Sequence, residues 1–178
     1  MLAWWLPAAW LDWQPGLVAH EPWRAFSAAF VHWSARHLGA NVLGALVVGA
    51  LGRAARLPPA AALAWLVAWP LVQLGLLMQP ELAHYGGLSG VLHAGVAVAG
   101  LWLVVTGRGR RRSVGAALLA GLAIKVLLER PWAGALAHPA GWDIAVAPLA
   151  HGCGAVAGVL TAALTLALQR QSRPGRDR

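Results

Sequence analysis

Residues 84–105 read HYGGLSGVLHAGVAVAGLWLVV, a polar, glycine-rich segment that runs directly into an apolar stretch. Ser89 stands between glycines where the two parts meet. The apolar part is typical of a membrane-spanning helix, which needs roughly 20 apolar residues to cross about 30 Å of hydrocarbon. A serine hydroxyl here lies just inside a membrane, and it is a candidate nucleophile if a base from another helix reaches it.

The composition of the whole chain indicates a membrane protein. Of its 178 residues, 59% are hydrophobic and 11% are charged, whereas soluble domains have roughly 25% charged residues. The net charge of +8 does not indicate binding to nucleic acid, because the basic residues collect at the ends of apolar runs instead of alternating with aromatic residues. The single cysteine, Cys153, excludes an internal disulfide and a CxxC zinc pair.

Five apolar runs predict membrane-spanning helices, and they cover residues 34–51, 58–78, 89–105, 113–128 and 147–168. A sixth run, residues 1–11, would reach only about 16 Å, so it is either a truncated first span or a short interfacial helix. The Trp-rich connection that follows it is predicted to lie in the membrane interface. The fold class is therefore an all-α polytopic membrane protein, a six-helix bundle with a short or truncated first helix. Residues 1–168 form its membrane domain, and residues 169–178 form a basic cytoplasmic tail.

The arginines predict the orientation of this bundle. Ten fall on one side, and they are Arg53, Arg56, Arg108, Arg110, Arg111, Arg112, Arg170, Arg173, Arg176 and Arg178. Three fall on the other side, and they are Arg24, Arg36 and Arg130. The positive-inside rule makes the first side cytoplasmic. The C-terminus is then cytoplasmic, the N-terminus is too if there are six spans, and the segment before Ser89 faces outward.

Polar residues from three predicted helices should meet at this outer depth. They are His32, His37 and Asn41 of the second helix, Ser89 and His93 of the fourth, and His151 of the sixth. His37 and Asn41 are four residues apart and share one helix face. A serine, a histidine that takes its proton and two further hydrogen-bond donors are the groups that acyl transfer requires.

Glycines on the fourth and sixth helices favour close contact between them. Gly90 follows the serine, and Gly154 and Gly158 form a G-x-x-x-G pattern after His151. Small residues allow helix backbones to approach closely, which would bring the Ser89 oxygen within about 3 Å of a His151 nitrogen. No carboxylate is assigned to the histidine, so we expect a Ser-His dyad whose base is oriented by packing.

These motifs resemble those of the rhomboid intramembrane serine proteases. Residues 32–41 contain H-x4-H-x3-N, residues 87–90 read GLSG like the family's G-x-S-G, and residues 150–158 read AHGCGAVAG like its A-H-x-x-G-x-x-x-G. Trp23 and Arg24 resemble the W-R pair of its first loop. The order of the motifs agrees as well, and the departure is the short first helix.

The resemblance implies roles for individual residues. Ser89 would be the nucleophile, and His151 the general base and later the acid for the leaving amine. An oxyanion hole would be formed by His37, Asn41 and the Ser89 backbone N–H. Further support residues, implied in the same way, are His32, Gly87 and His93. Many rhomboids have a tyrosine stacked on the catalytic histidine where His93 stands, so we expect His93 to pack beside His151.

The sequence is similar in particular to the bacterial rhombosortases within that family. These are short, read G-L-S-G-V-L-H as residues 87–93 do, and carry a K-x-x-x-E on the fifth helix as Lys125 and Glu129 do. This implies an endopeptidase of the bacterial inner membrane with its active site toward the periplasm. It would cleave C-terminal sorting tails of exported proteins, which contain a Gly-Gly motif, a transmembrane helix and a basic end. The implied partners are the lipid bilayer and these exported proteins, with no cofactor and no nucleic acid.

Several interpretations remain open at this point. Lys125 and Glu129 either form an ion pair that lowers the cost of two charges near lipid, or they bind substrate. No metal site is expected, because no H-x3-H pair or acidic cluster suits one. His20, His84 and His138 are predicted to be solvated loop residues.

Alternative functions are also open. The alternative to the enzyme is a non-catalytic rhomboid-like chaperone or sorting factor. A small transporter is disfavoured, because no internal repeat is found. The sequence does not determine whether an acyl-enzyme would react with water or with an amine.

Overall fold

The computed structural model describes residues 6–172, which are almost entirely helical. The five long helices are α2 (Ala35–Ala54), α3 (Pro59–Gly75), α4 (Ser89–Thr106), α5 (Arg110–Glu129) and α6 (Pro148–Gln171). The shorter elements are η2 (Ala8–Trp10), η3 (Pro15–Leu17), α1 (Arg24–Ser27), η4 (Ala28–Phe30) and η5 (Leu76–Met78). The predicted fold class, an all-α membrane bundle, is confirmed.

The long helices begin and end near the predicted residues because local chemistry stops the apolar runs there. Ser34 caps α2, where its hydroxyl accepts the backbone N–H of His37 at 3.0 Å. Pro59 and Pro148 stand at the first position of α3 and α6, where a missing N–H costs nothing. By length and apolarity, α2, α3 with η5, α4 and α6 can each cross a membrane. The equally long α5 carries charged residues at both ends.

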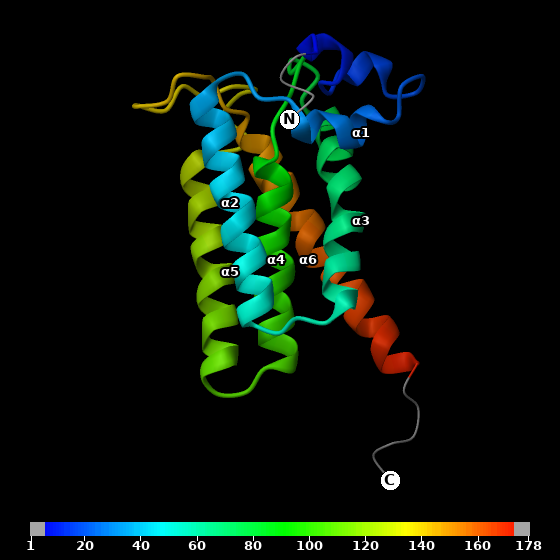
Figure 1. Cartoon of the computed structure of the whole chain (residues 1–178), viewed down its shortest axis with the longest axis vertical. Coiled ribbons are helices and arrows are strands. Elements are labelled where there is room, and N and C mark those ends of the chain that lie inside the picture. Colours follow the sequence, from blue (N-terminus) through cyan, green and yellow to red (C-terminus); the bar gives the residue numbers. More distant parts are fainter. Residues whose placement is uncertain (1–5, 173–178) are drawn as a thin grey trace.

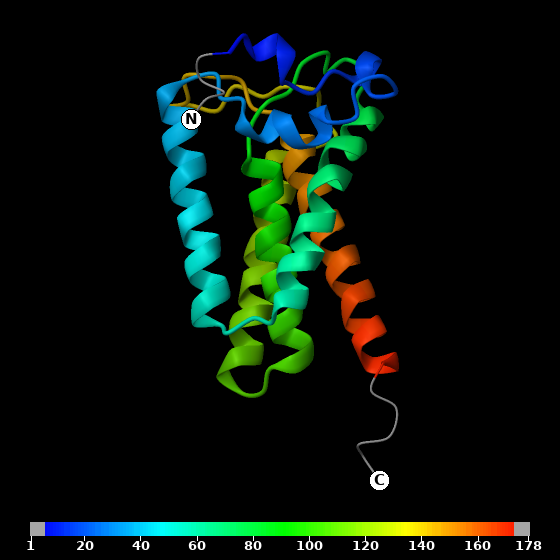
Figure 2. The same ribbon diagram turned by 45° about the vertical axis from the view of Figure 1, so that its right-hand side comes forward.

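Helix α4 lies at the centre of the bundle, where it contacts α2, α3, α5 and α6 (Figures 1 and 2). It is the helix with the most buried residues, and its glycines and alanines allow neighbours to approach from several sides. Helix α2, in contrast, packs mainly on α4 and buries only His37, Asn41 and Val48. The residue types on α4 therefore determine which helices meet around Ser89.

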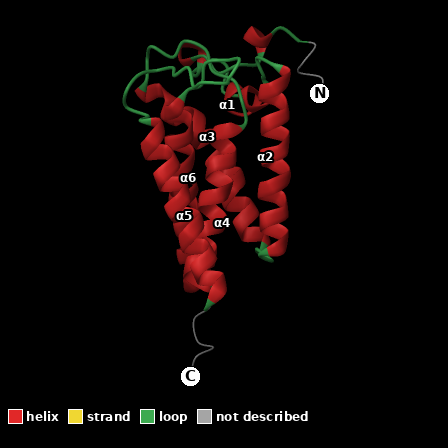
Figure 3. Cartoon of the chain, turned by 90° about the vertical axis from the view of Figure 1, so that its left-hand side faces the viewer, coloured by secondary structure: helices red, strands yellow, loops and turns green. Residues whose placement is uncertain are grey.

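The long connections gather at one end of the bundle and the short ones at the other (Figure 3). The first end contains residues 6–34, 79–88 and 130–147, together with the first turn of α4. The second end contains the short links α2–α3 and α4–α5, whose flanks carry the arginines of residues 53–56 and 108–112. This is the charge asymmetry that the sequence predicted for a multi-pass membrane protein.

Of the two alternatives predicted for residues 1–11, a truncated span or a short interfacial helix, the described part agrees with the second. Residues 1–5 lie outside the described residues, and the following apolar residues form only the 3-10 turn η2. The carbonyl of Ala9 accepts a hydrogen bond from Arg24 at 3.0 Å, and Trp13 pairs with Tyr85 through bonds of 2.7 and 2.9 Å. These contacts hold the described N-terminal residues at the same end as Ser89, whereas six spans would have put them at the opposite end. Residues 6–11 therefore lie at this end of the bundle and do not enter it as a helix.

A buried charge network anchors the first connection. The Arg24 guanidinium pairs with the Asp12 carboxylate at 3.2 Å and with Glu21 at 2.5 Å, and Arg24 and Asp12 are both buried. The second oxygen of Asp12 bonds to His84 Nδ1 at 2.7 Å. His84 is an exposed loop residue, as predicted, and its hydrogen bond to Asp12 also ties residues 79–88 to the first connection. His20 and His138 are exposed, as predicted.

Candidate active site

Ser89 is the first residue of α4, and the backbone before it has a special conformation. Gly87 has φ +134°, a value that residues other than glycine rarely adopt. Its N–H donates to the carbonyl of Ala28 at 2.9 Å. A Cβ added to Gly87 would lie 2.8 Å from His37 Nε2. Only glycine therefore lets this turn approach α2 so closely.

His151, in the first turn of α6, faces Ser89. Its Nε2 lies 2.9 Å from Ser89 Oγ, and the histidine is only 8% exposed. The glycines predicted to bring these helices together do lie at their contact. A Cβ on Gly154 would overlap the carbonyl oxygen of Gly90, and one on Gly158 would overlap that of Ala94. The missing side chains thus allow a hydrogen bond between residues 62 positions apart.

His93 stacks on His151, where the sequence predicted it. The ring centroids are 4.2 Å apart and the planes differ by 9°. His93 Nδ1 lies 2.7 Å from the backbone carbonyl of Ser89, so this nitrogen carries the proton. His93 thereby holds the first turn of α4 and covers one face of the His151 ring.

Glu129, at the end of α5, contacts the other nitrogen of His151. Its Oε2 lies 2.7 Å from His151 Nδ1, while its Oε1 accepts a bond from Lys125 Nζ at 2.5 Å. The expectation that packing alone orients the histidine is therefore wrong. A carboxylate cannot donate here, so Nδ1 carries the proton and Nε2 presents its lone pair to the Ser89 hydroxyl.

Two buried donors from α2 converge on Gly87. The Trp33 N–H points at His37 Nδ1 at 3.4 Å, which leaves the ring proton on Nε2, the nitrogen nearest Gly87. The Asn41 side-chain nitrogen has no hydrogen-bond partner although it is buried. It would lie 3.8 Å from a Cβ at Gly87. Buried donors such as the Asn41 nitrogen are rarely left unpaired, and His37 lines the adjacent cavity. Both donors are therefore suited to an oxygen that arrives with a substrate.

A small cavity of about 40 Å³ lies over this arrangement. His37, Ser89, His151 and Tyr85 line it, together with residues 144–147 of the connection between α5 and α6. It has room for a few water molecules, since each needs roughly 10–15 Å³ of such volume. Burial raises the pKa of Tyr85 to about 12, so its hydroxyl stays protonated and donates to the Gly87 carbonyl at 3.3 Å.

Comparison with known proteins assigns this arrangement to a family. A family model described as a rhomboid domain matches residues 19–168, most of the chain. The chain belongs to the rhomboid family. Rhomboids are generally intramembrane serine proteases, and some members are inactive. No curated protein and no solved structure matches this rhomboid.

His32, also predicted at this site, contacts His37 and not the cavity. The two rings meet edge-on with centroids 4.9 Å apart. His32 Nδ1 lies 3.1 Å from the carbonyl of Phe30, so it is a donor and leaves Nε2 as a buried acceptor without a partner. Burial lowers the pKa of His32, which disfavours its charged form. Its place in this rhomboid is therefore behind His37, on the side away from the cavity.

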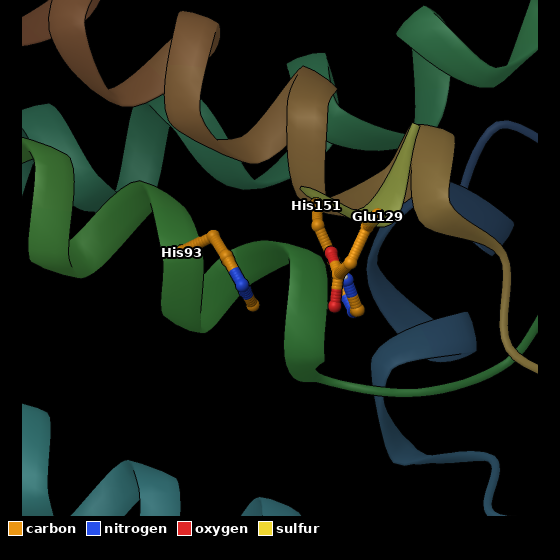
Figure 4. Close-up of side chains that lie close together, drawn as sticks. All are labelled: His93, Glu129 and His151. Carbon is orange, nitrogen blue, oxygen red and sulfur yellow. Dashed lines mark hydrogen bonds and ion pairs between the residues drawn. The ribbon is translucent and has the colours of Figure 1, made fainter. Parts of the chain in front are cut away.

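His93, Glu129 and His151 come from three helices and form a group with the composition of a metal site (Figure 4). Their candidate ligand atoms lie within 4.8 Å of one another. However, nitrogen lone pairs lie in the ring plane, and the two imidazole planes are nearly parallel. Those lone pairs do not converge on one ion, and both Nδ1 atoms already carry protons for other acceptors. As arranged, the group suits proton transfer better than chelation.

Glu129 is the site residue whose position the sequence did not reveal. It was interpreted through its neighbour Lys125, four residues away on the same helix. A signal was present, because Glu129 is the last residue of α5 and His151 lies in the first turn of α6, so both stand at the end of the bundle where these helices are connected. Two consecutive antiparallel helices place such residues at one depth, but which way each side chain points depends on helix rotation, which periodicity alone did not define.

Proposed function

We propose that this rhomboid is a serine endopeptidase in which Ser89 attacks a peptide carbonyl and His151 takes the serine proton. The observation that carries the proposal is the 2.9 Å contact between Ser89 Oγ and His151 Nε2. It supports activation of the hydroxyl, because the histidine lone pair is the group that faces it. A non-catalytic rhomboid would have no need for this contact under a cavity that admits water.

The proposed reaction proceeds by acyl transfer. Ser89 Oγ bonds to the carbonyl carbon, the carbonyl π pair moves to its oxygen, and the serine proton goes to His151 Nε2. The resulting oxyanion accepts hydrogen bonds from His37 and Asn41. When it collapses, the C–N bond breaks and His151 gives its proton to the departing amine. Water or another amine then attacks the acyl-enzyme and loses its proton to His151. As the bond between the acyl carbon and Ser89 Oγ breaks, His151 gives that proton to the serine oxygen, which restores both residues.

The proposed substrates are C-terminal sorting tails of exported proteins. The similarity of residues 87–93, Lys125 and Glu129 to the rhombosortases supports this choice. The arginines at the end opposite Ser89 support a site that faces outward from the bacterial inner membrane, toward the periplasm. There the transmembrane part of a tail would lie against the bundle and its Gly-Gly motif would reach Ser89. Glycine residues suit such a site, because they fit a narrow cavity and unwind a helix easily.

The decisive experiment follows the C-terminus of a reporter. An exported reporter with a Gly-Gly motif, a transmembrane helix and a basic end would be expressed with this rhomboid, and its C-terminus determined by mass spectrometry. We expect cleavage near the Gly-Gly motif, and loss of cleavage when both glycines are replaced by leucine. A free carboxylate would indicate hydrolysis, and an added mass would indicate transfer to an amine.

Labelling and binding measurements in the same cells distinguish the alternative substrates and functions. Wild-type protein that reacts with a fluorophosphonate at Ser89 but leaves the tail intact would contradict the substrate and keep the serine hydrolase. Protein that neither reacts nor cleaves, yet binds the reporter, would indicate the chaperone or sorting factor instead.

Removing an oxyanion donor should slow the reaction strongly. For Asn41→Ala we expect kcat for tail cleavage to fall by about 10²- to 10³-fold, the usual effect of losing one such donor. KM should change little, because the bond is strongest in the transition state. The matched control is Val42→Ala, the next residue on α2, whose side chain is exposed. An Asn41→Ala variant that loses affinity but keeps kcat would contradict the assignment.

A further inference from the structure

We infer that Glu129 is a positioning residue, which holds His151 in the orientation and protonation state that Ser89 needs, and that Lys125 holds Glu129 in turn. The inference rests on the proposed function, since it concerns how His151 acts as a base. In place of the expected Ser-His dyad, it gives a hydrogen-bonded triad of a carboxylate, an imidazole and a hydroxyl that come from three helices.

A continuous series of hydrogen bonds links Lys125, Glu129, His151 and Ser89. The Glu129 carboxylate uses one oxygen for His151 Nδ1, at 2.7 Å, and the other for Lys125 Nζ, at 2.5 Å. His151 Nε2 continues to Ser89 Oγ at 2.9 Å. The histidine side chain is about 10% exposed and that of Glu129 about 28%. The link between the two therefore lies at the edge of the bundle, shielded from most of the surrounding water.

A carboxylate on Nδ1 has a definite chemical effect. A neutral imidazole carries its proton on either nitrogen, and only the form with the proton on Nδ1 can accept from serine through Nε2. Glu129 accepts from Nδ1, so it favours that form and fixes the ring plane. When Nε2 takes the serine proton, the ring becomes positive, and the adjacent negative charge stabilises it. The proton on Nδ1 stays there throughout.

Lys125 has the complementary effect on Glu129. An unpaired carboxylate near lipid is costly, and a paired one is less so. Lys125 stands one turn earlier on α5 and its side chain is about 47% exposed, so it can reach the carboxylate from the solvent side. The ion pair leaves the second oxygen pointing at His151. The pair expected from the sequence thus forms, and it also orients the acceptor for the histidine.

Two other roles for Glu129 fit the contacts less well. An ion pair that only lowers the cost of charge needs no third partner, yet His151 Nδ1 lies within hydrogen-bond distance. A residue that binds substrate in the cavity would line it, and Glu129 does not, whereas its two oxygens contact Lys125 and His151. Its role is therefore exerted through His151 and not by contact with the substrate.

The test uses the 178-residue chain in detergent, with variants Glu129→Gln, Glu129→Ala and Lys125→Met. Two rates are measured, labelling of Ser89 by a fluorophosphonate and cleavage of the tail reporter. For Glu129→Gln we expect both rates to fall by about 10²-fold, less than the roughly 10⁴-fold known for a deeply buried carboxylate in a triad, because Glu129 is partly exposed. KM should stay within about threefold. Lys125→Met should cost less than tenfold, because the carboxylate remains.

Chemical rescue separates positioning from a merely structural role. Added formate can occupy the space that Glu129→Ala opens and accept from Nδ1, so we expect it to restore labelling at least tenfold. Chloride at the same concentration should not, and formate should not affect Ser89→Ala. Rescue is read on the folded, monodisperse fraction, so a partial loss of stability does not hide it.

The outcomes distinguish the two ideas. Wild-type rates in Glu129→Gln, or an unrescued loss in folded Glu129→Ala, would overturn the inference while labelling of the wild type at Ser89 still supported the enzyme. A rise in KM with unchanged kcat and labelling would overturn it in favour of substrate binding. Absence of labelling and cleavage in the wild type itself would instead contradict the proposed function.

Discussion

Ser89→Ala and His151→Ala are each expected to reduce tail cleavage by about 10⁶-fold, to the background rate, as in other serine proteases that lose either residue. Alanine at 89 has no nucleophile, and alanine at 151 leaves the hydroxyl without a base at 2.9 Å. Because the two act as one unit, the double variant should be no slower than either single variant. The measurement is the initial rate of reporter cleavage in reconstituted vesicles.

Matched controls separate this loss from a general effect of substitution. Ser113→Ala and His138→Ala remove the same groups from exposed positions of α5 and the α5–α6 connection, and they should leave the rate unchanged. Ser89→Ala should also fold normally, since one partly buried hydrogen bond contributes only about 1 kcal/mol. Measurable cleavage by Ser89→Ala would mean that another group is the nucleophile. Single-variant losses that add in the double variant would mean that Ser89 and His151 do not act as one unit.

The helices could be predicted from the sequence because whether a segment spans a membrane depends on its own length and apolarity. A run of the right length and apolarity spans the bilayer whatever the rest of the chain does, and α2, α3, α4 and α6 follow this rule. Residues 6–11 do not follow it, because they form only a 3-10 turn at the end of the bundle where Ser89 lies. Their placement depends on partners elsewhere, such as Arg24 for Ala9 and Tyr85 for Trp13.

In the site, too, some features follow from single segments and others depend on contacts between helices. The polar groups of His37, Ser89 and His151 could be placed at one depth from topology alone. The contact between Glu129 and His151 depends on how α5 is rotated about its own axis against α6. That rotation results from packing along the whole interface with α4, including the close fit of Gly115 against Gly100. Such a fit is a property of the assembled bundle, so single residues on α5 did not predict it.

The last prediction concerns Gly154, because the packing of α6 on α4 depends on it and a side chain there should lower stability markedly. A Cβ at Gly154 would overlap the backbone oxygen of Gly90, which cannot turn aside as a side chain can. For Gly154→Ala, α6 must therefore move away from α4, and overpacking of this kind costs up to about 3 kcal/mol. The better helix propensity of alanine raises the free energy of unfolding by only about 1 kcal/mol, which does not offset this cost. We expect the midpoint of thermal unfolding in detergent to fall by several degrees.

The same movement should also affect the chemistry. Ser89 and Gly90 are neighbours, and so are His151 and Gly154 within one turn of α6, so a shift of about 1 Å at the glycines lengthens the contact between hydroxyl and imidazole. Misplacement on this scale costs roughly 10²-fold in rate. The control is Gly152→Ala on the same turn, where a Cβ would meet Pro131 and Val126 at ordinary distances of 3.6–3.7 Å. It should keep both stability and labelling of Ser89, and equal behaviour of the two variants would show that the glycine contact does not set the distance between Ser89 and His151.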